Sequence, residues 1–262
     1  MKIGIIGMGV VGKTLHKAFK NLKHFCYGLD KHNKGELKEL ILCEIIYICL
    51  PTNYSNKGLN TNLVELYLKK LNNLKFNGIV AIKSTLNPGD TEKFIKKYRF
   101  LKNNICFVPE FLRERYSYKD FTKNHDLLLI GSNNKKINKK IIKSHGNYPK
   151  EISIVNTKEA ELIKIYSNAY NAARIVFANS FFELCDKINV NYSVILKSYL
   201  KRKMSTGKYL DCSKDLRGFG GKCLPKDLSA LNYLVRQKSK KVHLFKNIID
   251  QNNKFKKTIK KK

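Results

Sequence analysis

Residues 2–14 read KIGIIGMGVVGKT, and this stretch decides the fold of the first half of the chain. A short apolar run ends at Gly7, and Gly7, Gly9 and Gly12 form a GxGxxG pattern that leads into a helical pattern. The first glycine permits a tight turn, the second lets a pyrophosphate approach, and the third lets helix and strand pack closely. Asp30 closes the next apolar run, where a carboxylate suits a ribose 2′-hydroxyl and repels a 2′-phosphate. The stretch therefore predicts a dinucleotide-binding βαβ unit that prefers NAD to NADP.

The rest of the first half alternates short apolar runs with amphipathic stretches, which is typical of βαβ units and a parallel sheet. The predicted strands are residues 2–6, 24–30, 44–50, 78–84, 104–110 and 126–131. From residue 158 to 188 apolar side chains recur at helical spacing without glycine or proline, and shorter helical patterns follow at 191–200, 228–237 and 243–259. We predict an α/β class fold: a doubly wound, Rossmann-type parallel sheet over residues 1–152, a helical domain over 153–250 and a basic tail over 251–262.

Composition excludes several classes of protein. The chain has 262 residues, and its hydrophobic fraction of 43% is enough for a packed core. No apolar run approaches the ~20 residues of a membrane span, and glycines and Lys13 interrupt the N-terminus where a signal peptide is apolar. The seven cysteines form no CxxC pair, so they predict neither a metal site nor a disulfide framework. We expect a cytoplasmic protein without a membrane partner.

The formal net charge of +32 raises the hypothesis of nucleic-acid binding. However, lysines are spread along the whole chain, and only KFKKTIKKK at 254–262 forms a dense run. Lysine clusters without interleaved aromatic side chains are weak evidence for base stacking. We interpret the charge as a solvated surface that would attract an anionic small substrate, and we predict no nucleic-acid partner.

Six motifs follow one another along the chain. They are GMGVVG at 7–12, LPT at 50–52, KSTLNPG at 83–89, PEFLRE at 109–114, AELIKIYSNA at 160–169 and GFGGKCLPKD at 218–227. In this order they resemble the UDP-glucose/GDP-mannose dehydrogenase family, the nucleotide-sugar 6-dehydrogenases, and most of all the members that oxidise UDP-glucose. The resemblance covers nearly the whole chain. It implies a four-electron oxidation at C6 of the sugar that uses two NAD.

The resemblance also assigns chemistry to particular residues. A thiol must form first a thiohemiacetal and then a thioester with the sugar, and Cys223 is that nucleophile. Lys164 and Asn168 are four residues apart on one helix face and would stabilise the oxyanions. Asp227 matches the family's water-positioning aspartate and Glu110 its hydrolytic general base. The implied catalytic residues are Cys223, Lys164, Asn168, Asp227, Glu110 and Thr85.

Two sets of binding residues follow from the same resemblance. The implied cofactor-binding residues are Gly7, Gly9, Val10, Val11, Gly12, Asp30, Thr52, Thr85, Glu114 and Lys226. The implied substrate-binding residues are Phe111, Leu112, Arg113, Lys164, Asn168, Gly220 and Arg202, the last reaching the substrate of a neighbouring subunit. Because one face of the long helix at 158–188 is too apolar to leave in water, we also expect a homodimer through it.

The family usually continues into a further α/β domain that holds the nucleotide, and we expect no room for such a domain within these 262 residues. A separate chain is then expected to supply it, unless the chain is an inactive or split form of the enzyme. Other functions stay open. The chain could oxidise GDP-mannose or a UDP-amino sugar, or it could be a two-domain hydroxyacid dehydrogenase, which needs no cysteine. Outside enzymes, it could be a silent dimerising protein or a basic protein that binds nucleic acid.

Overall fold

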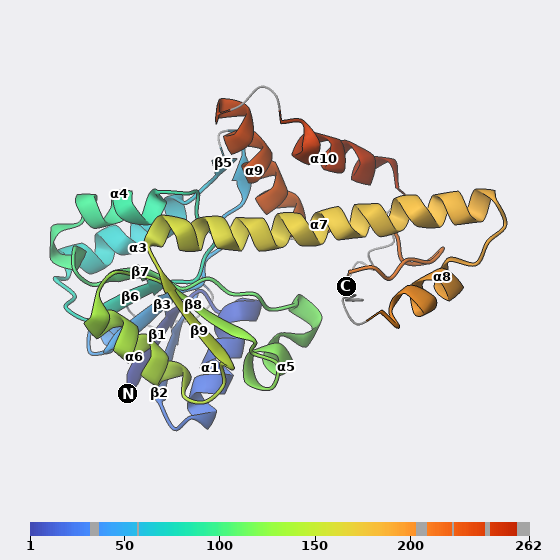
Figure 1. Cartoon of the computed structure of the whole chain (residues 1–262). Coiled ribbons are helices and arrows are strands. Elements are labelled where there is room, and N and C mark those ends of the chain that lie inside the picture. Colours follow the sequence, from blue (N-terminus) through green and yellow to red (C-terminus); the bar gives the residue numbers. More distant parts are fainter. Residues whose placement is uncertain (32–36, 57, 203–208, 222, 239–241, 256–262) are drawn as a thin grey trace. The chain divides into compact units, whose positions relative to one another are not determined.

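Figure 1 shows the computed structural model, which describes residues 1–31, 37–56, 58–202, 209–221, 223–238 and 242–255. The chain divides into two compact units. The first holds Met1–Asn53 and Asn60–Lys164, and the second holds Tyr54–Leu59 and Ile165–Lys262. The first unit extends past the boundary predicted at residue 152, because β9 (Glu151–Val155) pairs in parallel with β8 (Leu127–Gly131) and completes the sheet.

A seven-stranded sheet forms the centre of the first unit, in the order β2-β1-β3-β6-β7-β8-β9. Its other strands are β1 (Lys2–Ile6), β2 (Phe25–Leu29), β3 (Ile45–Ile48), β6 (Ile79–Ile82) and β7 (Ile105–Phe107). Neighbouring strands are parallel except β7 and β8, which pair antiparallel through Phe107 and Gly131. The segment between these two strands holds only η2 (Glu114–Tyr116) and α5 (Ser117–Thr122), and it returns the chain in the opposite direction. The mostly parallel sheet confirms the predicted fold class.

Strand residues alternate between two apolar layers, one on each face of this sheet. Ile3 and Ile5 pack with Phe19 in one layer, whereas Ile6 packs with Val64 in the other. The first layer includes residues of α1 (Val10–Asn21), α5 and α6 (Lys135–His145). The second includes residues of α2 (Leu37–Leu40), α3 (Asn62–Asn73), α4 (Asp90–Lys97), η1 (Arg99–Leu101) and the start of α7 (Thr157–Lys187). Helices on both faces make the sheet doubly wound.

The second unit is mainly helical and is built on the remainder of α7, the long helix in Figure 1. It also holds α8 (Tyr192–Tyr199), α9 (Leu224–Lys238) and α10 (Leu244–Lys254). A small hairpin of β4 (Tyr54–Ser55) and β5 (Gly58–Leu59) packs against α9. None of the described helices is long and apolar enough to span a bilayer.

Two boundaries in the second unit differ from the sequence prediction. The helix predicted at 228–237 begins earlier, at Leu224, because Pro225 is acceptable in a first turn, where its missing N–H has no helical partner. Residues 251–254 of the predicted tail belong to α10, and Phe255 is buried in the core of this unit. Residues 256–262 of that tail lie outside the described residues.

Candidate active site

The glycine-rich loop after β1 has the backbone that a dinucleotide cradle requires. Gly7 has φ +94°, and a Cβ there would lie 2.6 Å from the Cys49 carbonyl oxygen. A Cβ on Gly12 would lie 2.0 Å from the Gly7 carbonyl oxygen, whereas a Cβ on Gly9 would meet no atom within 4 Å. The space beside Gly9 is therefore open for a pyrophosphate. Because β1 lies between β2 and β3, the loop follows the strand at the topological switch point, where such folds bind ligands.

Side chains around this loop suit a nucleotide cofactor. Asp30 directly follows β2, and its Oδ2 accepts the Met8 N–H at 2.7 Å, so the carboxylate is held beside the loop. Gly9 is the N-cap of α1, whose first residues Val10 and Val11 are exposed and half-buried. Thr52 is buried after β3. These positions fit a dinucleotide with its phosphates at the start of α1.

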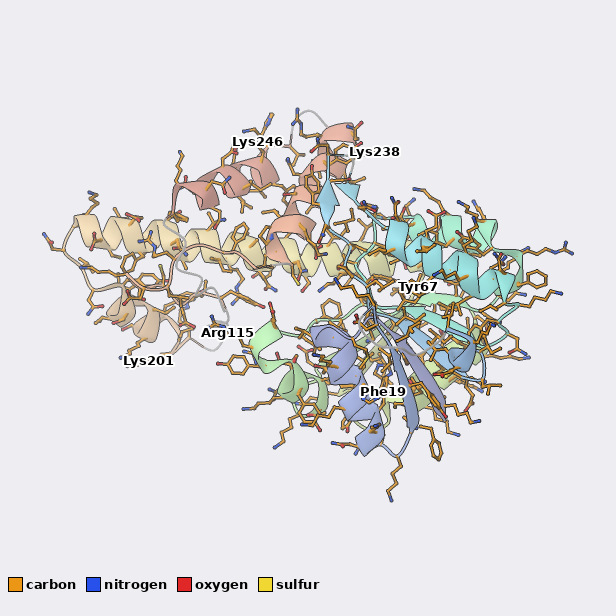
Figure 2. The ribbon with its side chains drawn as sticks, turned by 180° about the vertical axis from the view of Figure 1, so that it is seen from behind. Phe19, Tyr67, Arg115, Lys201, Lys238 and Lys246 are labelled. Atoms are coloured by element: carbon orange, nitrogen blue, oxygen red, sulfur yellow. The ribbon has the colours of Figure 1, made fainter. Side chains whose placement is uncertain are left out.

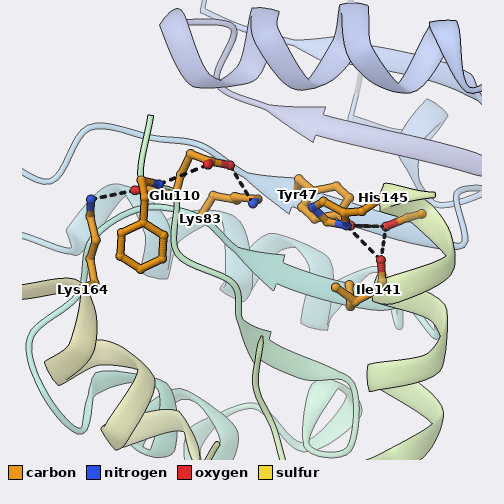
Figure 3. A network of polar contacts seen from close by, with 8 residues as sticks. Tyr47, Lys83, Glu110, Ile141, His145 and Lys164 are labelled. Carbon is orange, nitrogen blue, oxygen red and sulfur yellow. Dashed lines mark hydrogen bonds and ion pairs between the residues drawn. The ribbon is translucent and has the colours of Figure 1, made fainter. Parts of the chain in front are cut away.

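Glu110 is held at three points, all of them drawn in Figure 3. Its Oε2 pairs with Lys83 Nζ at 2.9 Å, and its Oε1 accepts the Phe111 N–H at 3.1 Å. Lys164 Nζ donates to the Glu110 backbone carbonyl at 2.6 Å and lies 5.2 Å from the Phe111 ring centroid. The structure therefore brings Lys164 and Glu110 together, as implied by the motifs. It adds Lys83, to which no role was assigned from the sequence.

Glu161 anchors the loop that follows β6 and carries Thr85. Its carboxylate, which is fully buried, accepts N–H groups from Gly89 at 2.5 Å and Thr91 at 2.8 Å, together with the Thr91 hydroxyl. These donors lie at the N-terminus of α4, where a negative charge is favourable. Burial raises the pKa of Glu161 above its ordinary value. Glu161 thereby ties α7, three residues before Lys164, to the Thr85 loop.

Arg113 makes contacts that no sequence pattern indicated. Its guanidinium donates two hydrogen bonds to the Asp120 carboxylate, of 2.8 Å from Nε and 2.7 Å from Nη2. This pairing, chiefly the side-chain hydrogen bonds, lowers the pKa of Asp120. Phe111 and Leu112 are half-buried beside it, and Glu114 is exposed in η2. Arg113 therefore links the two ends of the segment 113–120 to each other.

In the second unit, Cys223 lies at the first turn of α9. It is the exposed member of the free cysteines that the structure describes, and its carbonyl accepts the Asp227 N–H at 3.1 Å. Asp227 itself is fully buried. Its Oδ2 accepts from Asn168 Nδ2 at 2.5 Å, and its Oδ1 pairs with Lys226 Nζ at 2.5 Å. The structure thus joins three of the predicted residues in one network beside the thiol.

The segment before Cys223 is fixed by side chains of α7 and α10. Arg217 Nε and Gly218 N both donate to Asn179 Oδ1, at 2.8 and 2.9 Å. Asn252 bonds to both the N–H and the carbonyl of Phe219, at 2.8 and 3.1 Å. Gly218 and Gly221 have φ +64° and +72°, a backbone region that favours glycine. Gly220 is half-buried between these anchors and the thiol, and Arg202 is exposed after α8.

Exposed basic side chains are spread over several segments of the described chain. Figure 2 labels Arg115, Lys201, Lys238 and Lys246, which stand on different elements and are exposed. This distribution agrees with a solvated basic surface.

Two domain models of one family match the chain. The model of the family's NAD binding domain matches residues 34–147, and the model of its central domain matches residues 158–254. The chain belongs to the UDP-glucose/GDP-mannose dehydrogenase family. Its first unit contains the family's NAD-binding domain and its second unit the central domain.

Curated relatives carry names from the same family. The UDP-glucose 6-dehydrogenase of Rickettsia prowazekii is 32% identical over 179 residues, which are 66% of this chain and 40% of that enzyme. The UDP-glucose 6-dehydrogenase of Campylobacter jejuni is 32% identical over 216 residues, 80% of this chain and 53% of that enzyme. The chain thus spans about half, or less, of these relatives' length.

Solved structures share the fold at low identity. A UDP-glucose dehydrogenase from Pyrobaculum islandicum superposes with a TM-score of 0.85 at 20% identity, covering 96% of this chain and 68% of that one. A 3-hydroxyisobutyrate dehydrogenase from Mycobacterium tuberculosis reaches 0.76 at 11% identity, covering 97% of this chain and 92% of that one. Both classes of dehydrogenase therefore have this fold, and it is the sequence motifs that separate them.

Proposed function

We propose that this chain oxidises the C6 hydroxyl of a nucleotide sugar to a carboxylate, with UDP-glucose as the substrate and UDP-glucuronate as the product. The observation that carries this proposal is the setting of Cys223. An exposed thiol directly precedes α9, next to the buried hydrogen-bonded pair of Asp227 and Asn168, and a hydroxyacid dehydrogenase needs no such thiol. The names of the relatives support the same substrate class.

NAD would be held by the glycine-rich loop, by Asp30 at its ribose and by the N-terminus of α1. When bound, NAD supplies the hydride acceptor, and two molecules are used for each sugar. The open space beside Gly9 leaves room for the pyrophosphate, and the carboxylate of Asp30 disfavours a 2′-phosphate. We also include Thr52 and Val10 among the residues that would bind the cofactor.

Cys223 would act after the first oxidation has produced an aldehyde. Its sulfur attacks C6 and forms a thiohemiacetal; loss of a hydride from C6 then leaves a thioester. Water adds to the thioester, the C–S bond breaks, and the thiol is restored as the carboxylate leaves. In total, the alcohol, one water and two NAD give the carboxylate, two NADH and three protons.

The remaining polar groups have roles that follow from their contacts. Lys164 supplies a cation and Asn168 an amide donor, one turn apart on α7, for the oxyanions that develop during the reaction. Asp227 orients the Asn168 amide through their 2.5 Å hydrogen bond. Glu110, together with Thr85, would take up the proton of the hydrolytic water.

The test is the yield of NADH per UDP-glucose, with Cys223→Ser and the control Cys26→Ser. We expect two NADH per sugar for the wild type and the control, and no acid product from Cys223→Ser. Parallel assays with GDP-mannose and a UDP-amino sugar would identify the substrate. Acid formation by Cys223→Ser at the wild-type rate would overturn the proposed mechanism, and turnover of GDP-mannose in place of UDP-glucose would overturn the proposed substrate.

We also propose that the chain forms a homodimer through α7. One stripe of this helix exposes Tyr166, Tyr170, Phe177, Phe181 and Leu184, at spacings of three, four and seven residues, and Ile188 directly after the helix is exposed as well. Tyr166 is 71% exposed and stacks on Tyr170 with ring centroids 6.4 Å apart. A monomer rarely leaves so continuous an apolar stripe in water. Light scattering should give a dimer for the wild type and a monomer for Phe177→Glu; a monomeric wild type would contradict the proposal.

A further inference from the structure

We propose that Lys83 is a positioning residue for the acid-forming step, because it keeps Glu110 a carboxylate and fixes the direction of that carboxylate. This inference rests on the proposed function, in which Glu110 takes up the proton of the hydrolytic water. Lys83 precedes Thr85 in the KSTLNPG motif, and the proposed mechanism gives it no role.

The ion pair between Lys83 and Glu110 is enclosed by protein. Their side chains are 1% and 7% exposed, and Nζ lies 2.9 Å from Oε2. The rings of Tyr47 and Phe121 lie 6.0 and 5.8 Å from Nζ, so aromatic faces line the ammonium. A carboxylate in such surroundings is stable only when an opposite charge compensates it. Figure 3 shows Lys83 reaching Glu110 from one side and Lys164 from the other.

The other titratable groups around the pair are kept neutral by burial. Burial lowers the pKa of His125 and, further, that of His145. It raises the pKa of Tyr47 well above its ordinary value, that of Cys49 to about 12, and that of Cys106. Lys164 is the other nearby cation, and its Nζ donates to the backbone carbonyl of Glu110. Lys83 is the cation that forms the ion pair with the Glu110 carboxylate.

Lys83 also determines where the carboxylate points. Oε2 is bound to Lys83, while Oε1 accepts the Phe111 N–H and the backbone carbonyl accepts from Lys164. With these three contacts the carboxylate cannot rotate freely, so its remaining lone pairs keep one direction. A general base needs both features, since it must be unprotonated before each turnover and aimed at the water. Lys83 supplies them without touching the substrate, because it is almost completely buried.

The direct test is the ionisation state of Glu110 in Lys83→Met, read by infrared spectroscopy at neutral pH. We expect the carbonyl stretch of a protonated carboxyl group in Lys83→Met, and its absence from the wild type and from Lys83→Met/Glu110→Gln. The matched control is Lys93→Met, because Lys93 also pairs with a carboxylate, Asp90, but is 74% exposed. No protonated band is expected in the control, because Asp90 Oδ2 still accepts the backbone N–H and the side-chain amide of Asn87.

The catalytic test compares the effect of Lys83→Met on turnover with its effect on the binding of NAD and substrate. Lys83→Met should lower kcat for acid formation by about 10²- to 10⁴-fold, the range of a lost general base, with the Kd for NAD and the KM for UDP-glucose within about twofold. Lys83→Arg should regain part of kcat, because it restores the charge.

The experiments can refute the inference without refuting the proposed function, and the reverse. A wild type that forms no NADH contradicts the proposed function, yet the infrared comparison still decides the state of Glu110. An ionised Glu110 in folded Lys83→Met overturns the inference. If Lys83→Met does not fold, recovery of folding in Lys83→Met/Glu110→Gln supports charge compensation. Failure of both variants to fold shows that Lys83 serves packing instead, and overturns it.

Discussion

Glu110 and Cys223 occupy opposite kinds of surroundings, although both are proposed to act in one reaction. Glu110 is 8% exposed and is held at both carboxylate oxygens and at its carbonyl. Cys223 is exposed, and its position depends on the backbone at the start of α9. The contrast follows from their chemistry. A charged base gains from a fixed, low-dielectric setting, whereas a nucleophile must be reached by the carbon that it attacks.

The two settings are also stabilised by different means. Around Glu110 the contacts are between charges, and their loss leaves a buried charge without a partner. Around Cys223 the segment is fixed from both ends mainly by amide side chains: Asn252 and Asn179 hold residues 217–219, and Asn168 holds Asp227 in α9, where Lys226 also pairs with it. The comparison therefore predicts that mutations near Glu110 cost more stability than mutations near Cys223.

The largest expected effect is the difference in reactivity between exposed and buried thiols. Burial raises the pKa of Cys49 to about 12, so roughly 10⁻⁴ of this thiol is ionised at pH 8. Burial raises the pKa of Cys106 as well. Iodoacetamide should therefore alkylate Cys223 at least ~100-fold faster than either, as measured by peptide mass spectrometry. Equal labelling of Cys49 and Cys223 would contradict the expected difference in reactivity between these two thiols.

The next effect concerns the stability of the Glu110 setting. Lys83→Met should lower the free energy of unfolding by about 3–5 kcal/mol, because it leaves a buried carboxylate unpaired. Lys93→Met removes an exposed partner of Asp90 and should change the free energy of unfolding by about 0–1 kcal/mol. Urea denaturation of both variants at neutral pH measures the difference. Losses of equal size would show that burial does not set the strength of these pairs.

A smaller effect is expected in the segment before Cys223. Asn252→Asp removes the amide donor to the Phe219 carbonyl and should cost about 1–3 kcal/mol of stability. Asn247→Asp is the matched control, since Asn247 is exposed on the same helix and its replacement should stay within about 0.5 kcal/mol. Amide hydrogen exchange should also become faster at Phe219 in Asn252→Asp alone. Unchanged exchange there would argue that Asn252 does not fix the segment.

The sheet could largely be predicted from the sequence because buried parallel strands are apolar runs. The runs at 2–6 and 78–84 contain β1 and β6, and the helix predicted at 158–188 differs from α7 by one residue at each end. Strand β9 was not predicted, because it is a short edge strand on which Ile152 and Ile154 stay exposed and the polar residues Glu151 and Ser153 interrupt the apolar run. The β4–β5 hairpin consists of two-residue strands, which are too short to show any periodicity.

The site was predictable only as far as motifs name residues. Cys223, Asp227 and Asn168 came from motifs, and the structure joins the last two by a hydrogen bond. Lys83, although it lies in a motif, and Asn252 were given no role, because burial and pairing depend on contacts between distant parts of the chain. One signal was available for Lys83: it directly follows the fully apolar run of β6, where a lone charge must find a partner.

The smallest effect is a dependence of stability on pH that comes from Glu161. Burial raises the pKa of its carboxyl, so the folded chain holds this proton to a higher pH than the unfolded chain. The contribution of Glu161 to stability is complete below the unfolded pKa and is lost as the pH rises through the folded pKa. Its slope cannot exceed about 1.4 kcal/mol per pH unit for one proton. Glu161→Gln has no such proton, so the difference in unfolding free energy between wild type and variant should fall from pH 4 towards pH 8. A difference that rises over this range would mean that the N–H groups of Gly89 and Thr91 stabilise the charged form more than burial opposes it. Glu161 would then resemble Glu110, as a second buried carboxylate kept charged by its contacts, with backbone donors in place of a lysine.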